Sequence, residues 1–374
     1  MISATPGKML AALLLALTAC VPTWASAVEP RPFDHAGLAR QVLERHIVPG
    51  YARLTEAAKK LSRTLDRDCE RPFGKPPKPV DASVRNLVDA WGRIEHINFG
   101  PVTDDNRLER ILFFPDRRGL GARQVARALE TREAAVTDAA TLAGRSVALQ
   151  GLGALDIVLY GSGRSDSETP EQRAHRCAYA RAIAANLATL AQAILDAWSA
   201  PDGYRQHWLN AGPGDSVFVK PSETTLALAK ALNQGLERVR DERLGAALGL
   251  GKQRRKMPAV LDKGGLSLAL IKADLDGMLD MYEGGGMHAA IAPPDMKDDS
   301  DGIGTKAKLV ASEMKTARDE VAGVVRIPSP FESAASSGRL ISAGFPLKNA
   351  RELVHGLLTT RANLSLGFNS SDGD

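Results

Sequence analysis

The sequence predicts an all-α fold built from two packed helical-bundle domains. Alanine and leucine dominate the regularly patterned segments, and aromatic residues make up only 5% of the 374 residues. Alanine and leucine are strong helix formers. Apolar residues recur at helical spacing along almost the whole chain after residue 27, and no alternating segment of strand length stands out.

Five helices are expected in the first half of the chain. Pro49-Gly50 should kink or break the first helix, because proline lacks an amide donor. Pro170 should begin the last of the five, whose apolar residues recur every third or fourth position, as in a bundle helix. The expected ranges are 34–65, 81–98, 123–137, 138–160 and 170–198.

A stretch rich in glycine and proline, 201–221, marks the expected domain boundary. The helices expected beyond it cover 222–248, 266–282, 305–325 and 347–364. The predicted organisation is therefore an N-terminal bundle over 28–212 and a C-terminal bundle over 213–374.

Residues 1–27 have the features of an export signal. Lys8 precedes an apolar run, Met9 to Ala19, that is too short to span a bilayer. The regular small-x-small pattern of Ala25-Ser26-Ala27 favours cleavage after residue 27 and a soluble mature chain. Leu17-Thr18-Ala19-Cys20 resembles a lipobox, which is the alternative, with a lipid attached to Cys20.

An exported chain should lie in the periplasm or cell envelope. No later segment has about 20 uninterrupted apolar residues, so a lipid anchor is the only membrane attachment expected. Cys69 and Cys177 remain once Cys20 is assigned to the leader, and an even pair in an oxidising compartment predicts a disulfide. Two separate buried thiols are the alternative.

Charge and motif content exclude several classes of function. The formal net charge of +4 is small for this length and gives no reason to expect nucleic acid as a partner. None of the seven histidines lie four residues apart, so the two-histidine zinc helix of many metalloproteases is absent. Gly249-Leu250-Gly251-Lys252 resembles a phosphate loop, but Gln253 replaces the required hydroxyl residue.

The helix expected over 81–98 carries a carboxylate on its apolar face. At 100° per residue Glu95 projects onto that face, and His96 lies at its edge. The other members of the face are Val84, Leu87, Val88 and Trp91. A carboxylate in this position is costly unless it is ion-paired, hydrogen-bonded or bound to metal.

A second carboxylate, Asp156, lies on a core face of the helix expected over 148–161. Leu149, Leu152 and Tyr160 share this face. Gly153 lies one turn before Asp156 and leaves a gap in which a ligand, a water or another helix could approach.

Two interpretations of these carboxylates remain open. Each could pair with an arginine, for example Arg93, Arg145 or Arg181. Alternatively, Glu95 and Asp156 could point into one polar pocket and supply oxygen ligands to a cation. Oxygen donors beside an imidazole suit iron or another divalent metal better than a thiolate-binding ion.

Four segments together resemble the imelysin-like family, over nearly the whole chain after residue 27. Gln150 to Gly161, QGLGALDIVLYG, resembles the segment that holds the family's Gly-x-His-x-x-Glu motif. Arg93 to Pro101 resembles the family's early helix end. His46 to Tyr51 and Gly367 to Asp374 resemble the predicted-lipoprotein branch.

This resemblance implies an all-helical, two-domain protein of the bacterial periplasm or outer membrane. Family members were described as peptidases or as iron-regulated proteins implicated in iron uptake, with the motif facing a cleft between the domains. Gly151 matches the first motif position, whereas Gly153 occupies the histidine place and Asp156 the glutamate place. Peptidase activity by that route is therefore not expected.

Three functions remain as hypotheses. The favoured one is a non-catalytic binding component of the envelope, linked to iron or metal uptake through a site in the cleft. The second is an imelysin-type metallopeptidase that uses other ligands, such as Glu95 and His96. The third is a metal-free helical module that binds another envelope protein.

Overall fold

The chain folds into helices joined by turns, as the sequence predicts. The structure is a computed structural model, and it describes residues 1, 32–69, 76–161, 168–250, 255–296 and 299–364. No β-strand occurs within these ranges. Residues 2–27 of the predicted export signal, including Cys20, lie outside the described residues. So do Gly367 to Asp374, the C-terminal segment that resembles the predicted-lipoprotein branch. In the described part of the chain, no helix is long and apolar enough to cross a membrane.

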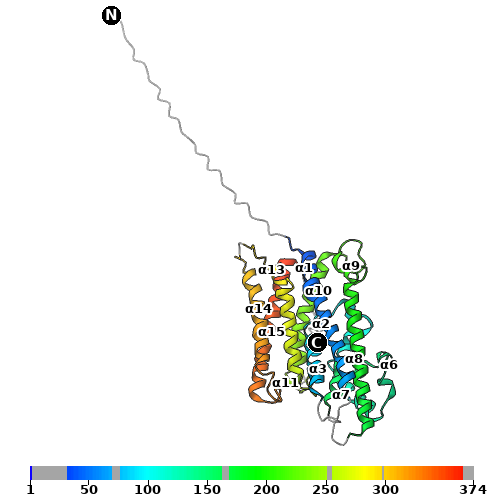
Figure 1. The fold of residues 1–374 in the computed structure, drawn as a ribbon. Helices are drawn as coiled ribbons and strands as arrows, with labels where there is room; N and C mark the ends of the chain where they lie inside the picture. Colours follow the sequence, from blue (N-terminus) through cyan, green and yellow to red (C-terminus); the bar gives the residue numbers. More distant parts are fainter. Residues whose placement is uncertain (2–31, 70–75, 162–167, 251–254, 297–298, 365–374) are drawn as a thin grey trace. The chain divides into compact units, whose positions relative to one another are not determined.

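The longer helices lie side by side in Figure 1. Helix α2 packs on α8 and α3, α3 on α12, α12 on α14, and α15 on both α14 and α10. Their bounds are α2 Val48–Asp68, α3 Lys78–Gly92, α8 Pro170–Ser199, α10 Pro221–Glu237, α12 Ser267–Leu279, α14 Ile303–Ala322 and α15 Ala334–Ala362.

Residues Phe33–Asp374 form one compact unit. Helices from before and after residue 212 pack directly on each other: α3 on α12, and α1 (His35–Val42) on α10. The stretch predicted as the boundary contains helix α9, Tyr204–Leu209. An aromatic cluster anchors this stretch through Phe99, Trp198, Tyr204, Trp208 and Phe218. The two predicted bundles therefore share one core.

The expected break at Pro49-Gly50 does not occur. Instead the π-helix η1, Leu43–Ile47, joins α1 to α2 without interruption. Pro49 is the second residue of α2, and the backbone before it is already helical, so the helix continues past a residue that has no amide donor. Two further π-helices occur in the described residues, η6 (Arg238–Gly245) and η7 (Asp280–Gly284).

The last helix begins 13 residues earlier than the expected start at Leu347. Pro346 lies inside α15, and the helix continues through it. Proline in a helix interior removes one hydrogen bond and costs about 3 kcal/mol. Packing against α14 and α10 offsets this cost, since Leu340, Ala343 and Leu347 around the proline are fully buried or nearly so.

The region expected to hold two helices over 123–160 is more divided. It contains α5 Leu120–Glu130, η4 Ala134–Val136, α6 Ala139–Ala143, η5 Val147–Leu149 and α7 Gly151–Tyr160. Asp138 caps α6 by accepting the backbone N–H of Thr141 at 2.8 Å. Gly144 ends α6, and Gly151, with a positive φ of 75°, begins α7.

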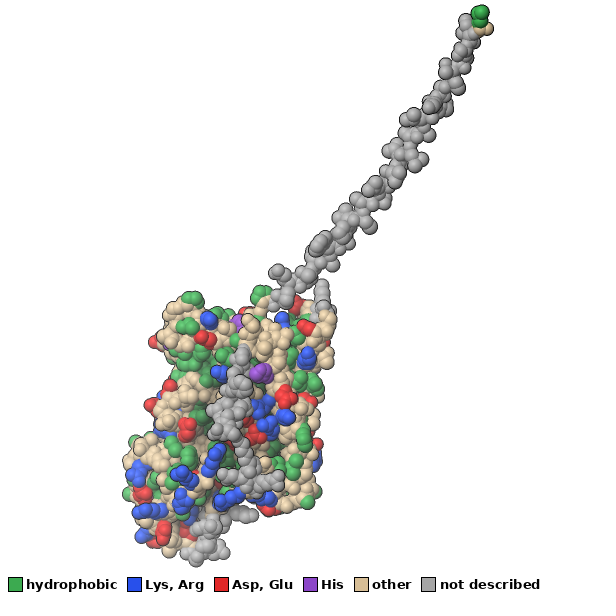
Figure 2. All heavy atoms as spheres, turned by 180° about the vertical axis from the view of Figure 1, so that it is seen from behind, with side chains coloured by type: hydrophobic (Ala, Val, Ile, Leu, Met, Phe, Trp, Pro, Cys, Tyr) green, Lys and Arg blue, Asp and Glu red, His purple; other side chains and the backbone are tan. Residues whose placement is uncertain are grey.

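Basic and acidic side chains are interspersed on the molecular face shown in Figure 2. This mixture agrees with the small net charge of the chain.

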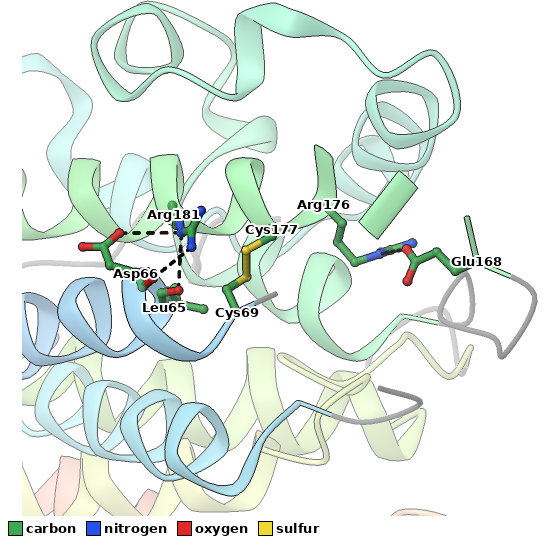
Figure 3. Close-up of a disulfide and its surroundings, with 7 residues drawn as sticks. All are labelled: Leu65, Asp66, Cys69, Glu168, Arg176, Cys177 and Arg181. Carbon is green, nitrogen blue, oxygen red and sulfur yellow. Dashed lines mark hydrogen bonds and ion pairs between the residues drawn. A yellow bond between two sulfur atoms is a disulfide. The ribbon is translucent and has the colours of Figure 1, made fainter. Parts of the chain in front are cut away.

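A disulfide joins Cys69, at the end of α2, to Cys177 in α8 (Figure 3). Nearby, the Arg181 guanidinium donates to the carbonyl oxygens of Leu65 and Asp66, so α2 and α8 are also held by polar contacts. The sequence separation of 108 residues makes the covalent loop long.

We predict that the double variant Cys69→Ser/Cys177→Ser unfolds more easily than the native chain. Opening a loop of this length should lower the free energy of unfolding by about 2–5 kcal/mol. Urea denaturation with and without reductant measures the effect. Reductant should destabilise the native chain and leave the double variant unchanged; a native chain insensitive to reductant would contradict the prediction.

Candidate functional site

The motif segment begins α7 at a position that only glycine can occupy. A Cβ on Gly151 would lie 2.4 Å from the carbonyl oxygen of Arg110 and 2.5 Å from that of Ile111. The positive φ of Gly151 disfavours other residues as well. This close approach fixes the start of α7 against the preceding chain.

Asp156 is buried on α7, and its carboxylate is held by backbone groups rather than by an arginine. One oxygen accepts the N–H of Gly264 at 2.8 Å, and the other accepts the N–H of Lys263 at 3.0 Å. Burial raises the pKa of Asp156 to about 6, although the two N–H donors favour the charged form.

The loop that carries Lys263 and Gly264 lies tightly against α7. A Cβ on Gly264 would lie 2.9 Å from Asp156 Oδ1 and 3.0 Å from a ring carbon of Tyr160. The Tyr160 hydroxyl donates to Asp81 Oδ1, in the first turn of α3, at 2.8 Å. The motif carboxylate is therefore located near the N-terminal end of α3.

Gly153, in the histidine place of the motif, borders open space. A Cβ built on it would meet nothing within 4 Å, and the residue is partly exposed. The site therefore has room for a side chain or a ligand where the family motif carries an imidazole.

Glu95 and His96 belong to a different part of the molecule. Both follow the C-terminal end of α3, and both are buried. Asp81 and Gly92, the last residue of α3, are eleven positions apart, which at about 1.5 Å per residue is about 16 Å along the helix, and Glu95 lies beyond Gly92. Because Asp156 lies near Asp81, Glu95 and Asp156 do not form the single cation pocket considered from the sequence.

Glu95 is paired with arginine, but not with any of the three arginines considered above. Its Oε2 accepts from Arg243 Nη2 at 2.6 Å, and its Oε1 lies 3.7 Å from Arg238. The second guanidinium nitrogen of Arg243 binds Asp274 of α12. We call Glu95, Arg238, Arg243 and Asp274 the core charge cluster.

Three members of the core charge cluster are almost fully buried, and Arg238 is 20% exposed. The side chain of Arg243 is only 1% exposed, and those of Glu95 and Asp274 are 8% and 7% exposed. Burial raises the pKa of Asp274, and the negative charge of Glu95 adds to this, while contact with Arg243 opposes it. The two carboxylates keep the pKa of Arg243 high, so its positive charge is retained.

A buried histidine pair adjoins this cluster. Nε2 of His46, in the π-helix η1, lies 3.0 Å from Nε2 of His96, so one imidazole donates and the other accepts. Burial lowers the pKa of His46 to about 3 and that of His96 well below its ordinary value. Both imidazoles are therefore neutral at pH 7. Within the described part of the chain, Nδ1 of His96 has no hydrogen-bond partner.

Sequence reasoning missed the partners of Glu95. Arg243 and Arg238 lie in the π-helix η6, where a fixed 100° rotation per residue does not give the side-chain direction. Asp274 offered a usable signal, because it is a carboxylate among the buried apolar residues of α12. Among the residues that the structure describes, no group of three or more His, Cys, Asp or Glu side chains could hold a metal ion.

The family model for imelysin, peptidase family M75, matches residues 47–341. This chain belongs to the imelysin family. The resemblance to the imelysin-like family inferred from the motif segments is therefore confirmed.

Solved structures have the same fold. An imelysin-like protein from Psychrobacter arcticum is 21% identical, with a TM-score of 0.71 over 89% of this chain and 97% of that one. A protein named as an iron-regulated protein A precursor, from Parabacteroides distasonis, is 12% identical, with a TM-score of 0.69 over the same shares. A search of the curated proteins finds none that matches.

We predict that Arg243→Met destabilises the fold by about 3–5 kcal/mol, because it leaves two buried carboxylates without their guanidinium. Replacing Arg243, Glu95 and Asp274 together by apolar residues of similar volume should recover much of the loss. Denaturation curves measure both effects. Arg238→Met, at the partly exposed edge of the cluster, is the control and should cost less; an equal cost would refute the assignment.

The histidine pair should make the fold acid-sensitive. His46 binds a proton near pH 6.5 when unfolded but near pH 3 when folded. Between these values the unfolded state holds the extra proton. Lowering the pH therefore removes up to about 1.4 kcal/mol of stability per pH unit through His46. This contribution is complete above pH 6.5.

His46→Gln should flatten the dependence of unfolding free energy on pH between 6.5 and 4.5, as measured by urea denaturation. His355→Gln, which changes an exposed histidine, should leave the slope unaltered. Asp156 and Asp274 have raised pKa values and act in the opposite direction, so the difference between variant and native slopes is the relevant quantity. Identical slopes for native chain and His46→Gln would contradict the prediction.

Proposed function

We propose that this imelysin-family chain is a non-catalytic binding component of the bacterial cell envelope, linked to iron acquisition. The observation that carries the proposal is the state of the motif. Gly153 supplies no imidazole, and both oxygens of Asp156 accept backbone N–H groups. Asp156 therefore holds the loop of Lys263 and Gly264 against α7, and Gly153 leaves space beside the helix. Neither residue is placed to activate a water molecule.

The space beside Gly153 is the binding surface in this proposal. It lies on α7, next to Ile157 and Tyr160, which are partly exposed on the same side of the helix. Helix α7 is fixed at its start by Gly151 and at Asp156 by the loop that carries Lys263 and Gly264. A ligand or partner would therefore meet a preformed surface, which reduces the entropic cost of binding.

The link to iron and to the envelope comes from relatives and from the leader. The solved neighbour from Parabacteroides distasonis is named as an iron-regulated precursor. Residues 1–27 of this chain have the pattern of an export signal. Both support an exported protein that acts where iron is taken up, either free in the periplasm or attached through a lipid on Cys20.

A peptidase that uses Glu95 and His96 fits the geometry less well. Glu95 and His96 are only 6% and 3% exposed. The carboxylate of Glu95 also accepts a hydrogen bond from Arg243. A peptide substrate would have to enter the core to reach them. A metal-free interaction module remains the second candidate, since the open surface at Gly153 suits a protein partner as well as a small ligand.

The proposal predicts that filling the space beside Gly153 abolishes function without unfolding the chain. In the native host, deleting the protein should slow growth when iron is withheld by a chelator. The native chain should restore growth, and Gly153→Phe should not. Gly338→Phe is the matched control, because it also adds a ring to a helical glycine that borders open space.

Equal complementation by Gly153→Phe and Gly338→Phe would refute the surface assignment. Unimpaired growth of the deletion strain would refute the link to iron. Chelator-sensitive peptide cleavage by the purified native chain, lost in Asp156→Ala, would refute the non-catalytic assignment. Elemental analysis of protein purified without chelators separates a metal carrier from a metal-free module.

A further inference from the structure

An open pocket of about 730 Å³ lies outside both the motif and the core charge cluster. It is bordered on one side by α5 and on the other by the turns around residues 133 and 144–149. We call it the arginine pocket. Its polar lining comprises Gln124, Arg127, Thr131, Glu133, Arg145 and Ser146.

The α5 wall presents three polar side chains on one helix face. Gln124, Arg127 and Thr131 lie three and four residues apart, while Val125 and Ala128 on the adjacent face are buried. Oε1 of Gln124 is buried and accepts no hydrogen bond from any described residue. This oxygen is an acceptor without a donor at the wall of a cavity, and such an atom is costly unless a ligand or water satisfies it.

The opposite wall is held in place by buried side chains. The carbonyl oxygen of Arg145 accepts from Gln150 Nε2 at 2.9 Å, and that of Leu149 accepts from the Tyr179 hydroxyl at 2.6 Å. Gln150 and Tyr179 are 1% and 0% exposed. The wall is therefore preformed rather than dependent on a ligand for its shape.

The two guanidinium groups of the pocket differ in their partners. Arg145 pairs with Glu133 at 2.5 Å. Arg127, by contrast, has no carboxylate within ion-pairing distance anywhere in the described ranges. Among the residues that the structure describes, the lining therefore carries one positive charge without a carboxylate partner. The planar guanidinium of Arg127 can bind a carboxylate through two parallel hydrogen bonds.

The rest of the lining favours an organic anion over an inorganic one. Leu149 supplies an apolar contact for a carbon skeleton, and the volume is much larger than a single small ion needs. The unsatisfied acceptor on Gln124 matches a hydroxyl donor. We propose that the arginine pocket binds a small hydroxycarboxylate, with a carboxylate on Arg127 and a hydroxyl donating to Gln124. This inference does not depend on the function proposed above.

Calorimetric titration of the full mature chain with citrate tests the proposal. The native chain should bind citrate, and Arg127→Gln should weaken binding at least tenfold. Arg123→Gln removes the same charge from the same helix outside the pocket and should change affinity less than twofold. Glu133→Gln should tighten binding several-fold, because it releases the guanidinium of Arg145.

The hydroxyl contact has its own matched ligand. Tricarballylate has the three carboxylates of citrate without the hydroxyl, so it should bind the native chain several-fold more weakly. Gln124→Met should remove that difference. The absence of citrate binding, an equal loss in Arg127→Gln and Arg123→Gln, or phosphate binding as tight as that of citrate would each overturn the proposal.

Discussion

The burial of Arg243 constrains the whole molecule. A guanidinium that is 1% exposed must be matched by anions at hydrogen-bond distance, and two distant parts of the chain supply them. Glu95 comes from the end of α3, Asp274 from α12, and the arginine itself from η6. If one of the three elements moved away, the charges on the other two would stay buried without their partners. The hydrophobic core is therefore continuous between the parts of the chain before and after residue 212.

Two π-helices bring polar side chains into the core. A π turn contains an extra residue relative to an α turn, so it changes the direction of every side chain that follows. Helix η1 turns His46 toward His96, and η6 turns Arg243 toward Glu95. Both π segments occur beside the same buried polar region. Their cost is offset by the hydrogen bonds that they allow.

Much of the fold was predictable, because apolar periodicity reports which face of a helix is buried. It located Glu95 and Asp156 on core faces, and both are buried. It did not reveal their partners, since periodicity carries no information on which helices meet. The rule that proline ends helices failed at Pro49, which directly follows the π-helix η1 in a continuous helix, and at Pro346, where packing against neighbouring helices offsets the lost hydrogen bond. Gly153 was identified as a gap from its residue type alone, and open space does adjoin it.

The disulfide between Cys69 and Cys177 closes part of the chain into a covalent ring. Everything between the two cysteines, including α3, Glu95 and the whole of α7, belongs to one covalent ring. Proteolysis at any single peptide bond of that ring opens the ring without releasing a fragment. A cleaved molecule would migrate at full mass until its sulfurs were reduced. In a protease-rich surrounding, such a molecule would keep its helices tethered after damage that would split a linear chain.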